Sequence, residues 1–267
     1  MDIQKNISEA IEYAKGLFTD FGRLIILMVL DLIPIVNFIV MGYYAKCIEE
    51  TPVSDSPPEL TDYGRLWVKG AKIFVAMFVY MIIPIILIIP IILIAFTVIL
   101  PLPTMLPFAA APSMRPSGFF YWSIFSFLGL LGIVIAFISA LLLAMGIVNM
   151  VKKDSLSKAF AIHEILDIIR NVGWGSYILW AIVMFIIAVV MGLIGAIPYI
   201  GWLITLVISP AFGVFAARSA TLVYLEGLGE AAPALEFPPS VDTKYCINCG
   251  AKIPVDAEFC PKCGHKQ

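Results

Sequence analysis

The sequence predicts an all-α membrane protein, a polytopic helical bundle of about five or six membrane segments followed by a small C-terminal zinc ribbon. The 267-residue chain is 61% hydrophobic and 13% charged, with a mean hydropathy of +0.99, which is more apolar surface than a soluble core of this length buries. Long uncharged runs recur along the chain, and two cysteine pairs with metal-binding spacing lie near its end. The net charge of -2 argues against a nucleic-acid partner, which requires a concentrated cationic face.

The first residues predict an amphipathic helix that lies on the membrane surface. Ile3, Ile7 and Ile11 recur at helical spacing, and charged side chains occupy the other faces. Glu9 and Glu12 interrupt the segment, and no apolar run with a small-residue cleavage site follows it. We therefore expect no cleaved secretory leader.

Residues 24–45 are apolar but contain Asp31, Pro34 and Asn37 near their middle. The segment either crosses the membrane once as a broken helix or enters and returns as a hairpin that turns near Pro34. Cytoplasmic flanks retain positive charge, so the basic residues of the N-terminal segment favour the hairpin, with a cytosolic N-terminus. These residues are Lys5, Lys15 and Arg23.

Four further uncharged runs are long enough to cross about 30 Å of hydrocarbon as helices. They are residues 73–100, 119–150, 177–196 and 202–224. Pro84 and Pro90 interrupt the first of these runs, so we expect a kinked helix there.

The distribution of basic residues predicts the orientation of these spans. Of the 17 Lys and Arg residues, only Arg115 falls in the proline-rich loop 101–118, which we therefore place outside. The basic segments on either side of the flanking spans, residues 46–72 and 152–170, are then cytosolic. The last hairpin turns outside at residues 197–201 and returns the C-terminus to the cytosol. We expect a multi-pass protein of the plasma membrane.

A unit of amphipathic segment plus apolar hairpin recurs three times. The amphipathic segments are residues 3–21, 63–72 and 155–171. The turn sequence Ile-Pro-Ile-Val-Asn-Phe at 33–38 resembles Ile-Pro-Tyr-Ile-Gly-Trp at 197–202. We interpret this as an internal duplication or triplication; the alternative is chance similarity between apolar sequences.

These motifs resemble an archaeal multi-span membrane family of unknown function, the DUF4013 type. The resemblance covers roughly the first 225 residues and rests on short stretches at 31–36, 42–44, 63–65, 70–72 and the later Ile-Pro turn. Asn37 departs from the pattern, where Gly is expected in the turn. The resemblance implies a membrane fold and an archaeal origin, and it transfers no catalytic residue.

The four C-terminal cysteines predict a structural zinc site. Cys246-x-x-Cys249-Gly and Cys260-x-x-Cys263-Gly form two knuckle turns, in which two sulfurs face one ion and the glycine permits the tight turn. The ten residues between the pairs are enough for a short hairpin. Four thiolates close the coordination sphere, so the zinc is expected to be structural; free thiols or a redox pair are the alternatives. Thiolates persist in a reducing compartment, in agreement with a cytosolic C-terminus.

Three domains follow from this organisation. Residues 1–226 are the membrane-embedded helical domain, residues 227–244 are a flexible linker rich in Pro, Ala and Glu, and residues 245–267 are the cytosolic ribbon. The remaining cysteine, Cys47, is expected to be a small apolar filler at a membrane boundary.

Asp31 is the candidate polar site within the membrane, because a carboxylate in hydrocarbon is costly and often functional. Asn37 is expected to share its surroundings. The alternative is that Asp31 lies at headgroup depth near the turn. Arg218 is expected to extend its side chain from the last span to the aqueous boundary.

No catalytic constellation appears in the sequence. His163-Glu164 begins like a metalloprotease helix, but Asp167 stands where the second His is needed. We therefore expect a protein that is not an enzyme. The leading hypothesis is a scaffold or adaptor in the lipid bilayer whose ribbon contacts a cytosolic or membrane protein. The alternative is a small-solute or ion transporter or channel that uses the polar site near Asp31.

Overall fold

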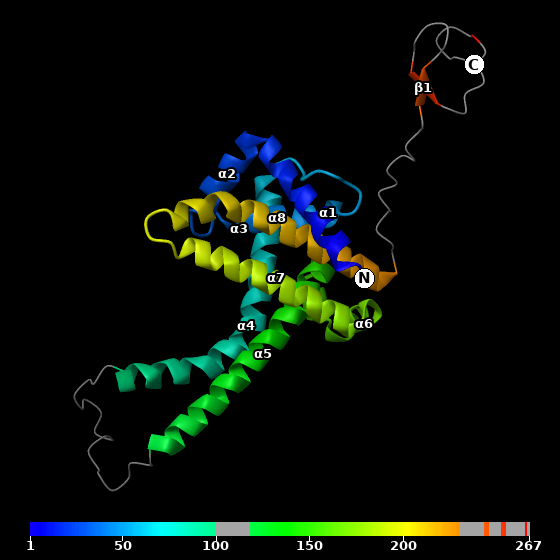
Figure 1. The fold of residues 1–267 in the computed structure, drawn as a ribbon. Helices are drawn as coiled ribbons and strands as arrows, with labels where there is room; N and C mark the ends of the chain where they lie inside the picture. Colours follow the sequence, from blue (N-terminus) through cyan, green and yellow to red (C-terminus); the bar gives the residue numbers. More distant parts are fainter. Residues whose placement is uncertain (100–117, 230–242, 246–251, 255–264, 266–267) are drawn as a thin grey trace. The chain divides into compact units, whose positions relative to one another are not determined.

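The body of the protein is a set of helices joined into hairpins (Figure 1). The computed structural model describes residues 1–99, 118–229, 243–245, 252–254 and 265. The chain divides into two units, Met1–Glu230 and Ala231–Gln267. The first unit contains the helices α1 (Ile3–Lys15), α2 (Phe21–Asp31), α3 (Phe38–Glu50), α4 (Tyr63–Ile99), α5 (Gly118–Lys152), α6 (Ile162–Val172), α7 (Trp174–Gly195) and α8 (Gly201–Leu228), with 3-10 turns η1 (Gly16–Thr19) and η4 (Leu156–Phe160). The second contains the strands β1 (Thr243–Tyr245) and β2 (Lys252–Pro254).

Three helices in the described part of the chain are long and apolar enough to cross a membrane. They are Phe127–Lys152 in α5, Trp174–Gly195 and Gly201–Leu228, which agree with three of the predicted spans. The fourth predicted span forms most of α4, which stays helical through Pro84. Figure 1 shows that α4 bends in its second half. Residues 101–117 of the predicted outer loop, Arg115 among them, lie outside the described residues.

The segment 24–45 forms a hairpin of two short helices. α2 has 11 residues and α3 has 13, or about 17 and 20 Å of helix, too short for ~30 Å of hydrocarbon. Both helices return to the same segment. Arg23 at the start of α2 and Tyr43 on α3 each donate a hydrogen bond to the carbonyl of Pro58, at 2.7 and 2.9 Å. The chain therefore leaves the hairpin on the side from which it entered.

The two proline turns share one backbone conformation. Ile35 and Tyr199, each directly after the proline, have positive φ values of 73° and 67°. In both turns the N–H four residues after the isoleucine donates to its carbonyl, from Asn37 to Ile33 at 3.0 Å and from Gly201 to Ile197 at 2.9 Å. An αL conformation is uncommon for a residue other than glycine, so its recurrence favours duplication over chance similarity.

The backbone conformation at position 37, where glycine was expected, does not require a glycine. Asn37 has an ordinary right-handed conformation, with φ -56°. Gly201 serves close packing, because a Cβ there would lie 2.3 Å from the carbonyl oxygen of Ile194. The two hairpins therefore differ in how closely their helices approach after the turn.

Two of the three predicted amphipathic segments differ from expectation. Residues 63–72 are the first turns of α4 and do not form a separate surface helix. Residues 155–171 are interrupted at Ala161, which separates η4 from α6. The buried face of α6 consists of Ile165, Ile168, Ile169 and Val172, whereas Ile162 at its first position is exposed. The unit of short helix plus hairpin is therefore clear for α1 with α2–α3 and for α6 with α7–α8.

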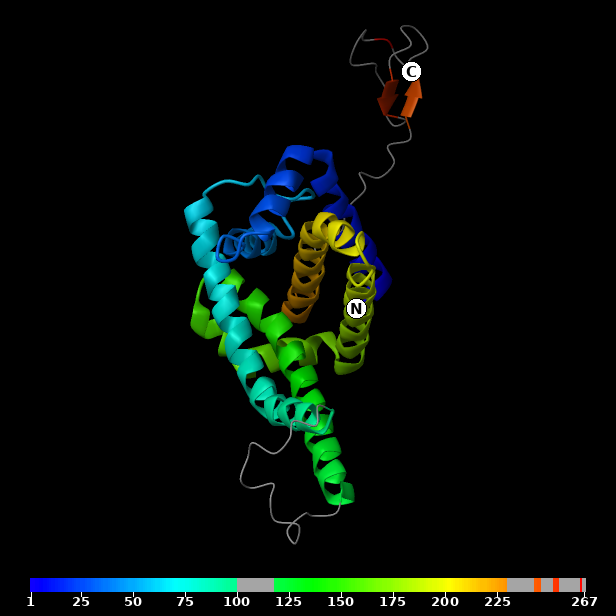
Figure 2. The same cartoon turned by 90° about the vertical axis from the view of Figure 1, so that its left-hand side faces the viewer.

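Helix α8 is the centre of the body. It contacts α1, α2, α3, α5, α6 and α7. Its second half is almost continuously buried, from Pro210 to Leu225. Figure 2 shows α8 between the α4–α5 pair and α7.

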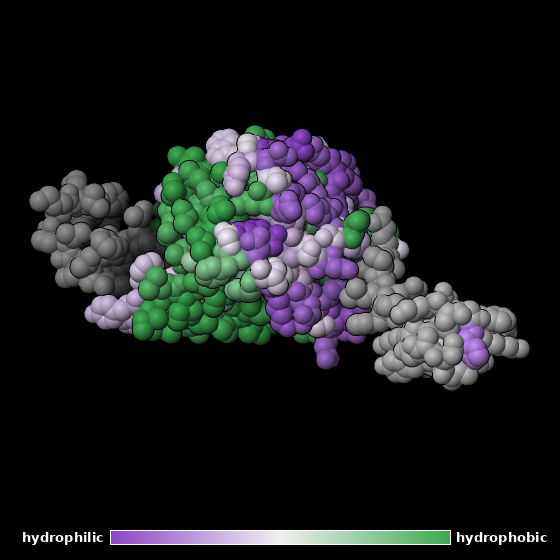
Figure 3. All heavy atoms as spheres, turned by 90° about the horizontal axis from the view of Figure 1, so that it is seen from above, coloured by the Kyte–Doolittle hydropathy of each residue, from purple (hydrophilic) through white to green (hydrophobic). Residues whose placement is uncertain are grey.

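The body has an apolar side and a polar side. The turns that join α2 to α3 and α7 to α8 lie at the left of Figure 1, and α6 and the end of α8 lie at the right. Figure 3, seen from above, shows hydrophobic residues on the left and hydrophilic residues on the right. Exposed Ile35, Ile197 and Tyr199 belong to the apolar turns. The hairpin tips therefore lie on the side that suits hydrocarbon.

Helices α3 and α4 approach at the distance of backbone contact. A Cβ on Gly70 would lie 1.8 Å from the carbonyl oxygen of Phe38, and one on Gly42 would lie 1.8 Å from that of Leu66. Small residues that allow such contact are typical of helix pairs in membranes, where dispersion forces and close packing drive association.

We predict that Gly70→Ala destabilises the body, because the two backbones must separate. The expected loss in the free energy of unfolding is about 1–3 kcal/mol. Gly64→Ala on the same helix is the matched control, since a Cβ there meets nothing within 4 Å. SDS titration of both variants in detergent micelles, followed by circular dichroism, measures the difference. Equal stability of the two variants would contradict the close contact.

Candidate functional site

A polar network fastens the amphipathic helix α1 to the central helix α8. Ser219 donates a hydrogen bond from its hydroxyl to Asn6 Oδ1 at 2.6 Å, and Asn6 Nδ2 donates to the Ser219 carbonyl at 3.1 Å. Trp180 of α7 donates from its indole N–H to the Ser219 hydroxyl at 2.9 Å. All three side chains are buried, and each of these polar groups has a partner. The network thus joins α1, α7 and α8.

Arg218 lies inside the protein and does not extend to the aqueous boundary as predicted. Its side chain is 4% exposed and donates to Glu9 Oε1 at 2.8 Å. It also donates to the Ser54 carbonyl at 2.9 Å, and its guanidinium lies 4.7 Å from the centre of the Tyr13 ring. The buried charge is therefore paired with α1 and held by the loop after α3.

The basic segments assigned to one side by the charge rule meet in a single layer. Lys69 of α4 pairs with Glu49 of α3 at 2.5 Å, and Lys72 pairs with Asp154 at 3.0 Å. The N-terminal ammonium pairs with Glu226 at the end of α8 at 2.7 Å. The N-terminus and the end of α8 therefore lie on the same side of the body, as the hairpin interpretation requires.

Glu164 of α6 belongs to the same layer and contacts the end of α5 and the segment that follows it. Its carboxylate accepts hydrogen bonds from Lys153 at 2.7 Å, Lys158 at 2.5 Å and Asn149 at 3.3 Å. These donors, Lys153 foremost, lower the pKa of Glu164 to about 2. The side chain of the preceding residue, His163, is 94% exposed, and its Nδ1 lies 3.0 Å from Asp167 Oδ2, which agrees with a polar helix face.

Asp31 and Asn37 are brought together as predicted. Asn37 Nδ2 donates to Asp31 Oδ1 at 3.2 Å across the first proline turn. Ser209 of α8 donates its hydroxyl to Asp31 Oδ2 at 3.1 Å. Each carboxylate oxygen thus accepts one side-chain hydrogen bond, and the site joins the first hairpin to the last. The sequence contained no signal for Ser209, which lies 178 positions away.

The described part of the ribbon places two strands around the first cysteine pair. β1 and β2 are antiparallel, with Tyr245 opposite Lys252. Their connection, residues 246–251, contains Cys246 and Cys249 in the sequence. The two strands therefore flank the first pair in the sequence, and β2 lies among the ten residues that separate the pairs. The predicted ligands Cys246, Cys249, Cys260 and Cys263 lie outside the described residues.

The profile of a family described as "Protein of unknown function (DUF4013)" matches residues 26–200, and that of a zinc-ribbon domain matches residues 245–267. The chain belongs to the DUF4013 family. Neither a curated protein nor a solved structure matches it significantly. With its long apolar helices, this DUF4013 chain is an integral membrane protein.

The DUF4013 match begins within α2 and ends just before α8, so it omits two elements on which the packing depends. Asn6 and Glu9 on α1 and Arg218 and Ser219 on α8 lie outside it. Sequence reasoning also missed their pairing. The available signal was Asn6, which lies in one helical row with the small residues Ala10 and Ala14.

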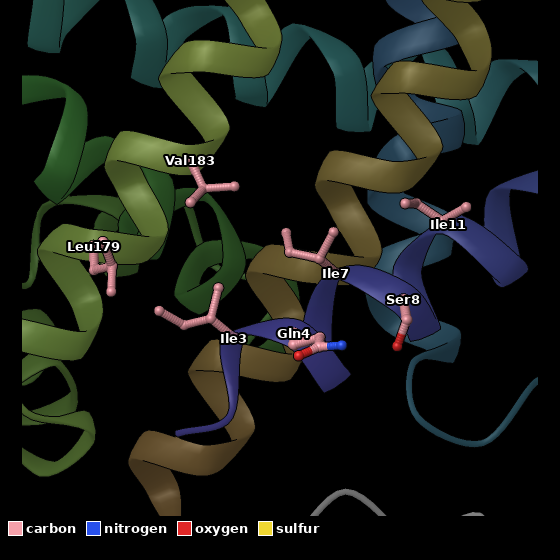
Figure 4. A pocket seen from close by; sticks show the side chains of 7 residues that line it. All are labelled: Ile3, Gln4, Ile7, Ser8, Ile11, Leu179 and Val183. Carbon is pink, nitrogen blue, oxygen red and sulfur yellow. The ribbon is translucent and has the colours of Figure 1, made fainter.

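A groove runs between α1 and α7 in the DUF4013 body (Figure 4). Its volume is about 490 Å³, and Ile3, Ile7, Leu179 and Val183 are among its lining residues. Figure 4 shows Ile3 and Ile7 on the side of α1 nearer to α7, with Gln4 and Ser8 at the outer edge. This arrangement suits a helix at the boundary between hydrocarbon and water.

Remaining boundaries differ slightly from the predicted domains. α8 continues through Leu228, because Gly227 packs tightly on α6 and its carbonyl accepts a hydrogen bond from Asn171 at 2.9 Å. β1 begins at Thr243. Cys47 is fully buried in the body, as expected of an apolar filler.

We predict that Glu9→Gln destabilises this DUF4013 protein by about 3 kcal/mol, because Arg218 then carries an uncompensated buried charge. Glu12→Gln is the matched control, since Glu12 is 71% exposed and pairs with exposed Lys15. The control is expected to change stability by less than about 1 kcal/mol. Chemical unfolding in micelles, monitored by tryptophan fluorescence, compares the two. A similar loss of stability in both variants would show that the buried pair contributes no more to the free energy of unfolding than the exposed pair.

Proposed function

We propose that this DUF4013 protein is a membrane-anchored adaptor, in which the helical body holds a zinc ribbon at the cytosolic membrane surface for contact with a protein partner. The observation that carries the proposal is the match of a zinc-ribbon domain at residues 245–267, on the C-terminal side of an integral membrane body. The proposal includes no catalytic step and no nucleic acid.

The residues present suit a structural zinc ion. Two Cys-x-x-Cys-Gly motifs supply four soft thiolate donors, which are the ligands that structural zinc prefers. In the sequence, β1 ends just before Cys246 and β2 begins three residues after Cys249. Cys260 and Cys263 would complete the tetrahedron, and zinc bound there would fold the ribbon.

The cytosolic placement of the ribbon is inferred from the distribution of charge. The layer that contains the N-terminus, the basic loops and the end of α8 is the cationic side of the body, and cationic segments remain in the cytosol. The ribbon follows α8 in the chain after residues 229–242, and a reducing cytosol keeps its cysteines free for zinc. The plasma membrane is the proposed location.

We predict that the purified protein contains one equivalent of zinc and that Cys249→Ser lowers this content severalfold, because three thiolates leave the site open. Cys47→Ala is the matched control, since Cys47 lies in the body and is expected to leave the metal content unchanged. Elemental analysis of the three proteins measures the zinc. Absence of zinc from the parent protein, or equal zinc in all three, contradicts the ribbon.

The adaptor role has its own test. Affinity capture from native membranes with the parent chain and with Cys249→Ser is expected to give a protein partner that is lost from the variant. The loss follows because an unfolded ribbon cannot present a fixed surface. Identical partners for both chains would leave the ribbon without a role in recognition.

A second candidate function is transport of a small solute or ion through the site at Asp31. The observation that favours it is the contact of Asp31 with both Asn37 and Ser209, which places one carboxylate between the first and last hairpins. Under this candidate, Asp31→Asn abolishes flux into reconstituted vesicles, because the charge is lost while the size is kept. Ser209→Ala is expected to reduce flux less. Vesicles with the parent protein that show no flux exclude transport of the solutes tested.

A further inference from the structure

An apolar cavity lies within the helical body, between α3, α4, α5, α7 and α8. Its volume is about 550 Å³. Small residues on facing helices leave this space open, among them Ala144 of α5, Ala181 of α7, and Ala216 and Ala217 of α8. The cavity belongs to neither the zinc ribbon nor the Asp31 site.

The cavity wall is almost entirely hydrocarbon. Two of its polar lining side chains direct their hydrogen-bonding groups into the protein. Tyr177 donates its hydroxyl to the carbonyl of Leu141 at 2.6 Å, and Trp180 donates its indole N–H to Ser219 at 2.9 Å. Water needs two to four polar partners to remain in a cavity, so this wall does not suit water.

The cavity has a mouth on the lipid-facing surface and a buried inner end. Phe185 is 67% exposed and Phe137 is 44% exposed, and both line the mouth. Trp180, Val148 and Ile48 are buried at the inner end. The mouth residues belong to α5 and α7, whose apolar stretches are candidate membrane spans. A molecule already in the bilayer therefore reaches the cavity from the side.

We propose that this cavity binds the hydrocarbon chain of a membrane lipid. An apolar cavity of ~150 Å³ holds one benzene molecule, so about 550 Å³ accommodates roughly twenty carbon atoms, the scale of one lipid chain. An empty space of this size would deprive its lining of dispersion contacts, which a flexible chain restores. The bilayer supplies such chains at high concentration at the mouth.

The bound chain would fill the space between the first and last hairpins and the α4–α5 pair. Met41, Met77 and Met184 line the cavity, and their flexible thioethers adapt to a chain of variable conformation. The proposal is independent of the adaptor role, because none of the ribbon residues takes part.

Quenching of Trp180 fluorescence tests the proposal. Trp180 is 3% exposed and lines the cavity, whereas Trp202 is 57% exposed and faces the bilayer. Two full-length variants retain one tryptophan each, Trp180 or Trp202, with the others changed to Phe. Both are reconstituted into vesicles of dioleoyl phosphatidylcholine or of the same lipid brominated at mid-chain. We expect bromine to quench Trp180 to an extent comparable with Trp202. Quenching of Trp202 alone overturns the proposal.

A filled cavity supplies the second measurement. Ala144→Phe places a ring in the cavity, and Leu130→Phe on the lipid-facing side of the same helix is the matched control, since Leu130 is 64% exposed. In the Trp180-only chain, we expect Ala144→Phe to abolish the quenching and Leu130→Phe to leave it unchanged. Quenching that persists in a folded Ala144→Phe chain overturns the proposal, because the bromine then reaches Trp180 by another route. If Ala144→Phe does not fold, the comparison of Trp180 with Trp202 still decides.

Discussion

The pairing of Arg218 with Glu9 is the interaction on which the arrangement of the body most depends. Arg218 lies on the central helix, and its charge is almost fully removed from water. A buried guanidinium is tolerated only when a counter-charge and hydrogen-bond acceptors surround it. Glu9 supplies the charge from α1 and Ser54 supplies a carbonyl from the loop after α3. The amphipathic helix at the start of the chain is thereby fixed to the helix at the end of the body.

The same constraint organises the rest of the body. Charge is unfavourable in hydrocarbon, so lysines and carboxylates lie together in one layer at the ends of the helices, where Lys69 of α4 pairs with Glu49 of α3 and Lys72 pairs with Asp154. The hairpins project from this layer and end in apolar proline turns. Within the apolar region the helices associate through glycine and alanine, because close packing replaces the hydrophobic effect there. Where small residues line facing helices without contact between them, a cavity remains.

The unit of short helix plus hairpin occurs in two copies that differ in length. α1 with α2–α3 and α6 with α7–α8 share the order of short helix and hairpin, and both turns hold a non-glycine residue at positive φ. The first hairpin has helices of 11 and 13 residues, whereas the second has helices of 22 and 28 residues, long enough to span. Asp31 in the first hairpin accepts a hydrogen bond from Ser209 in the second, so its carboxylate has a partner on the longer hairpin.

The sequence by itself determined the class of the protein, the approximate limits of its long helices, the proline turns and the family. These features rest on local signals, namely the length of apolar runs, the distribution of lysine and arginine, and short motifs. It also indicated that Asp31 and Asn37 are neighbours, because six residues across a tight turn leave little freedom. Tertiary structure alone decided that Arg218 is buried, that Ser209 reaches Asp31, and that residues 63–72 continue into α4. Each of these depends on contacts between segments far apart in the chain, for which hydropathy carries no information. A charge, in particular, is buried only where the fold places an opposite charge from a distant part of the sequence beside it.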